Sequence, residues 1–142
     1  MIDWGKLEGV SHICLEAPEG VIYSARLSEL SEPEEMKRFL TLYGERMRAL
    51  EPAAAASYFS GWLGLLALGQ QYAVSVFNEA IDLSPERVIL LLHGTEWASF
   101  SFKLEEVSTF PAPEREEERS GWLRMQLEQT YAATLRPLLQ AA

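Results

Sequence analysis

The stretch AAAASYFSGWLGLLALGQQYAVSVF, from Ala53 to Phe77, decides the fold because it contains no charged residue. A run of this length is typical either of a membrane-spanning helix or of a helix at the centre of a domain. Gln70 and Gln71 interrupt the run, and it is flanked by Glu51 and Glu79 instead of a basic anchor. The run therefore predicts the central, buried helix of one domain and no membrane span.

Small residues recur within this helix at Ala53, Ser57, Gly61 and Gly64, which places them on one helical face. Glycine costs a helix about 1 kcal/mol relative to alanine, so the two glycines indicate that another backbone packs closely there. The aromatic side chains of the same helix, Tyr58 among them, are expected in the core.

The chain before this helix predicts two further segments. Residues 1–30 are expected to be an extended arm or strands, because residues 11–26 hold two short β-rich runs around a turn. Ser31 and Glu34 form a capping-box pattern that begins a helix from about 32 to 49. Pro52 separates that helix from the central one.

The chain after it predicts a hairpin and a last helix. VILLLHGTEWASFSFKL, residues 88–104, reads as two strands joined around His93, with clear alternation in the second strand. The last helix is expected from about 114 to 140, with a kink near Pro137. Together these elements predict an α+β fold over residues 1–142: a mainly helical single domain with a long buried central helix and a β-hairpin or small antiparallel sheet.

The composition of the chain limits the classes of function that it can have. The 142 residues carry a net charge of −9 without a basic stripe, which excludes nucleic acid as a partner. The single cysteine, Cys14, and the absence of a signal-peptide pattern favour the cytoplasm. No nucleotide-binding, zinc-binding or nucleophile motif is present, so the sequence predicts neither a catalytic residue nor a metal ligand set.

Three segments, RLSELSEPEEMKRFLTLYGERMRALEP, SYFSGWLGLLALGQQ and LSPERVILLLHGTEWASFSF, taken in order, resemble the N-terminal half of FhuF-like ferric siderophore reductases. The same family region recurs in the C-terminal part of siderophore synthetases of the IucA/IucC type. The resemblance runs from about Arg26 to Gln140. In that family an iron–sulfur cluster is held by cysteines near the C-terminus, and this chain lacks that segment, so no cofactor is expected in it.

The resemblance implies a siderophore-related domain that binds a ferric siderophore without reducing it. Aromatic side chains and one or two cations suit such a ligand, which makes Arg46, Trp62, His93 and Trp97 the candidate binding residues. The alternative is a non-catalytic interaction module whose small-residue helix face binds a partner protein or a second copy. A third interpretation is a reductase fragment whose gene continues past Ala142.

Overall fold

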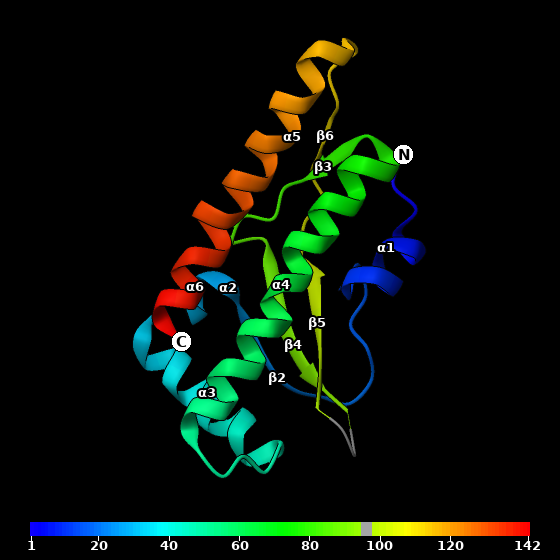
Figure 1. The fold of residues 1–142 in the computed structure, drawn as a ribbon. Helices are drawn as coiled ribbons and strands as arrows, with labels where there is room; N and C mark the ends of the chain where they lie inside the picture. The colour runs from blue at the N-terminus through cyan, green and yellow to red at the C-terminus, as the bar shows by residue number, and fades with distance from the viewer. Residues whose placement is uncertain (95–97) are drawn as a thin grey trace.

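The uncharged run forms helix α4 (Pro52–Phe77), which lies lengthwise across the middle of the molecule (Figure 1). The computed structural model describes residues 1–94 and 98–142. α4 begins at its proline, whose missing N–H needs no partner in a first helical turn. It ends at Asn78, which adopts the left-handed conformation typical of a helix C-terminus.

The predicted helix before α4, and the hairpin and last helix after it, appear in the predicted order, with further short helices and strands among them. The remaining described helices are α1 (Trp4–Ser11), α2 (Leu27–Leu30), α3 (Pro33–Arg46), α5 (Glu116–Thr130) and α6 (Arg136–Ala141), with a π-helical turn, η1 (Tyr131–Leu135), between the last two. The described strands are β1 (Ile13–Cys14), β2 (Val21–Arg26), β3 (Glu79–Ile81), β4 (Val88–His93), β5 (Ser99–Leu104) and β6 (Thr109–Pro111). The predicted α+β class is confirmed, and the described residues form one domain.

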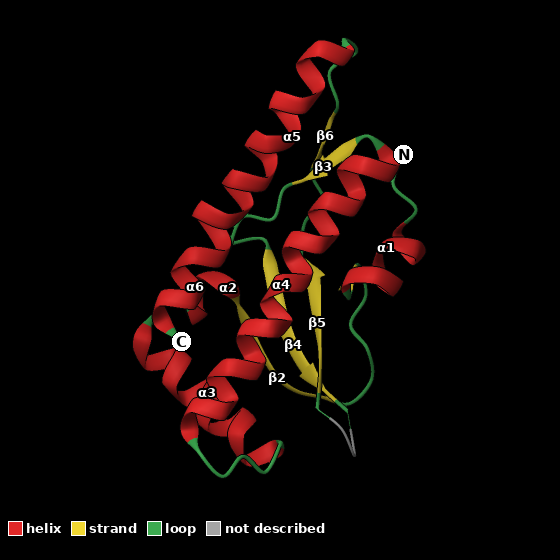
Figure 2. Cartoon of the chain, in the orientation of Figure 1, coloured by secondary structure: helices red, strands yellow, loops and turns green. Residues whose placement is uncertain are grey.

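Four strands form the main sheet in the order β1-β5-β4-β2, in which β1 runs parallel to β5 and the other pairs are antiparallel. Helix α4 crosses in front of this sheet, and α5 and α6 lie to the left of α4 in the same view (Figure 2). The predicted alternation in β5 is confirmed, because Phe100, Phe102 and Leu104 are buried while Ser99 and Ser101 are only half-buried. Strands β3 and β6 form a separate antiparallel pair.

The predicted extended arm is wrong over its first part, where residues 4–11 form α1. Asp3 caps this helix, since its Oδ1 accepts a hydrogen bond of 3.1 Å from the Lys6 N–H. Little in the sequence indicates this helix, because a helix of only two turns shows too little of the 3.6-residue period. Residues 27–30 form the short helix α2.

The small-residue face of α4 is not the packed face. No described atom lies within 4 Å of the Cβ position of Gly61 or Gly64, so the predicted close packing there is wrong. The close approach occurs at Gly69, where an added Cβ would stand 2.4 Å from Ile13 Cδ1 and 2.9 Å from Ser11 Cβ. α4 is therefore buried on the side that faces the sheet and exposed on the other.

Within residues 1–94 and 98–142, no helix combines the length and hydropathy that crossing a bilayer requires. The kink expected near Pro137 takes the form of the π-helical turn η1 just before it. Proline has no N–H to donate, and its ring crowds the carbonyl four residues earlier, so the turn widens.

Candidate functional site

A hollow on the exposed face of α4 is the best candidate for a binding site. Its volume is about 440 Å³, and its described lining residues are His12, Tyr58, Gly61, Trp62 and Leu65. Gly61 makes the hollow possible, because it contributes no side chain between its neighbours on the helix. Tyr58 stands beside it with 62% of its surface exposed. We call this feature the α4 hollow.

Aromatic packing holds the floor of the α4 hollow in place. The Trp62 ring lies edge-on to Phe100, with centroids 5.1 Å apart. Phe100 in turn contacts Phe59 and Tyr43 in the core, at centroid distances of 5.6 and 5.0 Å. Trp62 also donates a hydrogen bond to the Tyr43 hydroxyl, which partly offsets the rise in the pKa of Tyr43 caused by burial. These contacts hold the Trp62 side chain in place.

His12 reaches the hollow from the other end of the sequence. It ends α1 in a left-handed conformation, with φ of 62°, and its carbonyl accepts a 2.9 Å hydrogen bond from the Phe102 N–H. Its Nδ1 lies 2.8 Å from the Phe100 carbonyl oxygen, which can only accept, so Nδ1 carries the proton. The ring then lies edge-on to Trp62, with centroids 5.3 Å apart.

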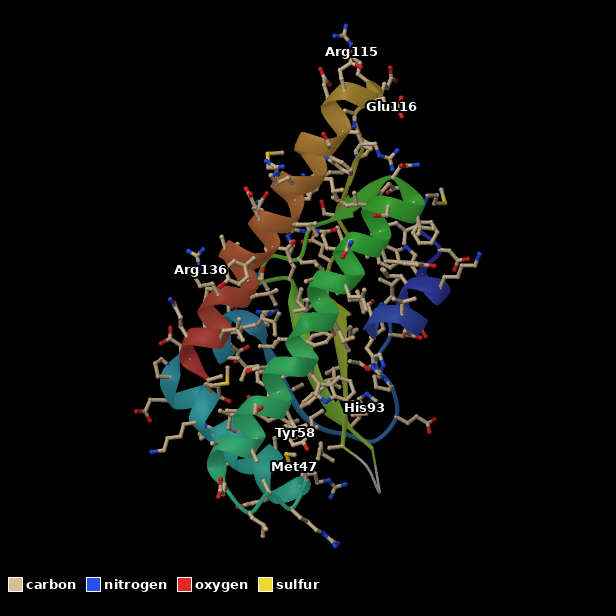
Figure 3. The ribbon with its side chains drawn as sticks, viewed as in Figure 1. Met47, Tyr58, His93, Arg115, Glu116 and Arg136 are labelled. Carbon is tan, nitrogen blue, oxygen red and sulfur yellow. The ribbon has the colours of Figure 1, made fainter. Side chains whose placement is uncertain are left out.

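His93 lies at the end of β4, at the same end of the molecule as Tyr58 in Figure 3. Its Nε2 is 2.9 Å from Ser101 Oγ, on the sheet face opposite to that of the buried Phe100. Burial lowers the pKa of His93, His12 lowers it further, and a hydrogen bond to the Phe100 backbone partly opposes both effects. The two histidines, distant in sequence, are thus neighbours in the fold.

Of the four residues proposed from sequence, the three that the structure describes do not line one pocket. Trp62 lines the α4 hollow, whereas His93 is not among the described lining residues. Arg46, at the end of α3, donates a 2.9 Å hydrogen bond from Nη2 to the Gly94 carbonyl in the hairpin turn. Trp97 lies outside the described residues.

Two lining residues, His12 and Tyr58, were missed by the sequence reasoning. Tyr58 was expected in the core, yet its position three residues before Gly61 places both on one helical face, and that spacing was the available signal. Nothing local marks His12, because a parallel strand pairing brings it to the hollow.

Among the described residues, no three histidine, cysteine, aspartate or glutamate side chains group as metal ligands. No protein family model and no curated protein sequence matches the chain.

Proposed function

We propose that the α4 hollow binds a neutral ferric hydroxamate siderophore, and that the chain is a siderophore-binding domain without redox activity of its own. The single observation that supports this proposal is the chemistry of the hollow. Three of its described lining side chains are aromatic rings, and none is a carboxylate, an ammonium or a guanidinium group. The proposal requires no cofactor in this chain. We place the protein in the cytoplasm as part of the same proposal.

The lack of ionic groups selects one class of siderophore. Three hydroxamate groups, each a monoanion, balance the charge of one ferric ion, so a ferric trihydroxamate is neutral. A ferric tris-catecholate carries three negative charges, which a protein of net charge −9 repels. Burying such an anion in the hollow without a positively charged partner also costs free energy.

A fluorescence titration with gallium(III) ferrichrome, a neutral trihydroxamate, tests the proposal. Gallium replaces iron because its complex does not absorb the tryptophan emission. We expect a saturable change in emission that Trp62→Phe abolishes and that Trp122→Phe, the matched control on α5, retains. The gallium(III) complex of a tris-catecholate should give no saturable change.

Gly61→Leu provides a second, independent variant, because a Cβ at this position would stand in open space and the longer leucine side chain would occupy the hollow. It should weaken binding at least about tenfold, which corresponds to about 1.4 kcal/mol. Full affinity in Gly61→Leu, or an unchanged response in Trp62→Phe, would show that the ligand binds elsewhere or not at all.

A second candidate function is an interaction module, favoured by the extent of the exposed face. Uncharged residues continue along α4 well past the hollow, to Leu68 and Val76, which are 43% and 51% exposed. An isologous dimer requires a surface that complements itself, and here the projecting Tyr58 lies beside a hollow on the same helix. Two antiparallel copies of α4 would insert each Tyr58 into the hollow of the other copy.

Sedimentation velocity over a range of protein concentrations tests the dimer. We expect the mass to rise toward that of a dimer, and Leu68→Glu to keep the chain monomeric while leaving gallium(III) ferrichrome binding intact. A monomer at every concentration would exclude this dimer.

A further inference from the structure

A second cavity lies away from the α4 hollow, where the π-helical turn η1 approaches the segment that follows β3. It has a volume of about 110 Å³. Its described lining includes Ser84, Phe110, Thr130 and Thr134. We call this feature the η1 cavity.

The hydroxyl groups that line the η1 cavity already donate their hydrogen bonds to other atoms of the protein. Thr130 Oγ1 donates to the Gln126 carbonyl at 2.9 Å, and Thr134 Oγ1 donates to the Leu83 carbonyl at 2.7 Å. Ser84 Oγ donates to the carboxylate of Asp82. A hydroxyl has one proton and two lone pairs, so toward a guest these three groups are acceptors.

The buried side-chain amide of Gln70 also uses its donors and its acceptor in hydrogen bonds within the protein. Its Oε1 accepts from the Ile81 N–H at 2.8 Å, and its Nε2 donates to the Ile81 carbonyl at 2.7 Å. The second hydrogen on Nε2 points to Thr130 Oγ1, 3.2 Å away. Gln70 therefore has no donor left for a guest, and the floor of the cavity presents lone pairs.

Two neighbours add a preference for positive charge. Asp82 lines the cavity and adds negative charge, although its Oδ1 accepts from the N–H and the hydroxyl of Ser84 and its Oδ2 lies 3.1 Å from Arg87 Nε. Phe110 lines the cavity too and is 44% exposed, and an aromatic ring beside a cavity attracts a cation. The net charge of −9 favours a cation over an anion at any such site.

We propose that the η1 cavity binds a small primary alkylammonium ion, whose N–H groups donate to the hydroxyls of Ser84, Thr130 and Thr134 while the CH₂ group next to its nitrogen, which shares the positive charge, contacts the ring of Phe110. An ammonium group supplies three donors and no acceptor, which matches a floor of acceptors. The small volume limits the guest to a few heavy atoms. Gln126 and Gln129 line the cavity as well, and their side-chain amides offer both donors and acceptors, so they do not discriminate between guests.

An NMR titration of the full chain with ethylammonium chloride tests this proposal. We expect saturable shifts of the backbone amide signals of Ser84, Thr130 and Thr134, with the signals of the α4 hollow unmoved. Potassium chloride controls for ionic strength and for a metal ion at the same oxygens. Tetramethylammonium chloride controls for a cation without N–H donors, and ethanol for a donor without charge.

Two variants, one at an exposed and one at a half-buried residue, keep the test independent of folding. Phe110→Ala should weaken binding about three- to fivefold, the effect of an exposed cation–π contact, and Ser84→Ala should weaken it as well. Val107→Ala, an exposed change in the loop before β6, is the matched control and should bind like the wild type.

Absence of saturable shifts with ethylammonium would overturn the proposal. Equal shifts with potassium or tetramethylammonium would also overturn it, as they would indicate a metal-ion site or a simple cation–π contact. Unchanged affinity in both Phe110→Ala and Ser84→Ala would place the guest outside the η1 cavity.

Discussion

At the scale of single residues, two glycines of α4 have opposite surroundings although their sequence contexts look alike. Gly69 lets Ser11 and Ile13 approach the helix backbone, whereas Gly61 faces open space. Gly69→Ala should therefore lower the free energy of unfolding by about 1–3 kcal/mol through overpacking. Gly61→Ala, its control in the same helix, should raise it by about 0.5–1 kcal/mol because alanine is the better helix former. Urea unfolding measures both changes, and equal effects would contradict the packing at Gly69.

Cys14 is a second residue whose surroundings give a testable property. It is buried, and burial, followed by the charge of Glu8, raises its pKa to about 11. Only the thiolate attacks Ellman's reagent, so the folded protein should react about a hundredfold more slowly than a thiol of ordinary pKa. Cys14→Ser combined with Ser75→Cys, which places a thiol on an exposed helix position, should react fast. Rapid reaction of native Cys14 would show that β1 opens readily.

At the scale of elements, the side chain of Gln70 joins α4 to β3. Its amide satisfies both the N–H and the carbonyl of Ile81, which are buried with it. Gln70→Leu should lower the free energy of unfolding by about 2–4 kcal/mol, since each unsatisfied buried group costs about 1–3 kcal/mol. Gln71→Leu, its exposed neighbour, should change stability by less than about 0.5 kcal/mol. Denaturant titrations of the two variants measure both changes in the free energy of unfolding. Similar losses of stability in the two would contradict this role of Gln70.

The elements that could be predicted from sequence are those with a local signal. α4 follows from the uncharged run and its flanking proline, and the hairpin of β4 and β5 follows from alternating residues such as Phe100 and Ser101. The helix α1 and the parallel pairing of β1 with β5 could not be predicted in this way. A contact between segments so distant in the chain leaves no periodic pattern in either of them.

The candidate site was predictable only in part, for the same reason. Trp62 was named from its place on the long helix and does line the α4 hollow. His12 comes from the distant N-terminal segment, so no spacing pointed to it. The exposed side of α4 was assigned to the core because absence of charge indicates burial only on average, and here the uncharged Tyr58, Leu68 and Val76 are exposed.

At the scale of the whole molecule, His93 makes stability depend on pH. Its pKa in the folded protein is lowered below the ordinary value of 6.5, by burial first and by His12 second. Its neutral form therefore stabilises the fold above that value, and this contribution is lost as the pH falls through the lowered pKa. His93→Gln should flatten the acid side of the stability profile measured by urea unfolding. An identical profile in the variant would show that other groups cause the pH dependence.

The pairing of β1 with β5 has a consequence for synthesis on the ribosome. His12 and Phe100, which the pairing joins, are 88 positions apart, and the chain emerges from its N-terminus. Ile13, wholly buried in the finished protein, must wait until β5 has left the exit tunnel before it can dock. Closing so long a loop is also slow in refolding. A segment made well before β5 is thus among the last to find its place, and until then a chaperone has an apolar stretch to hold.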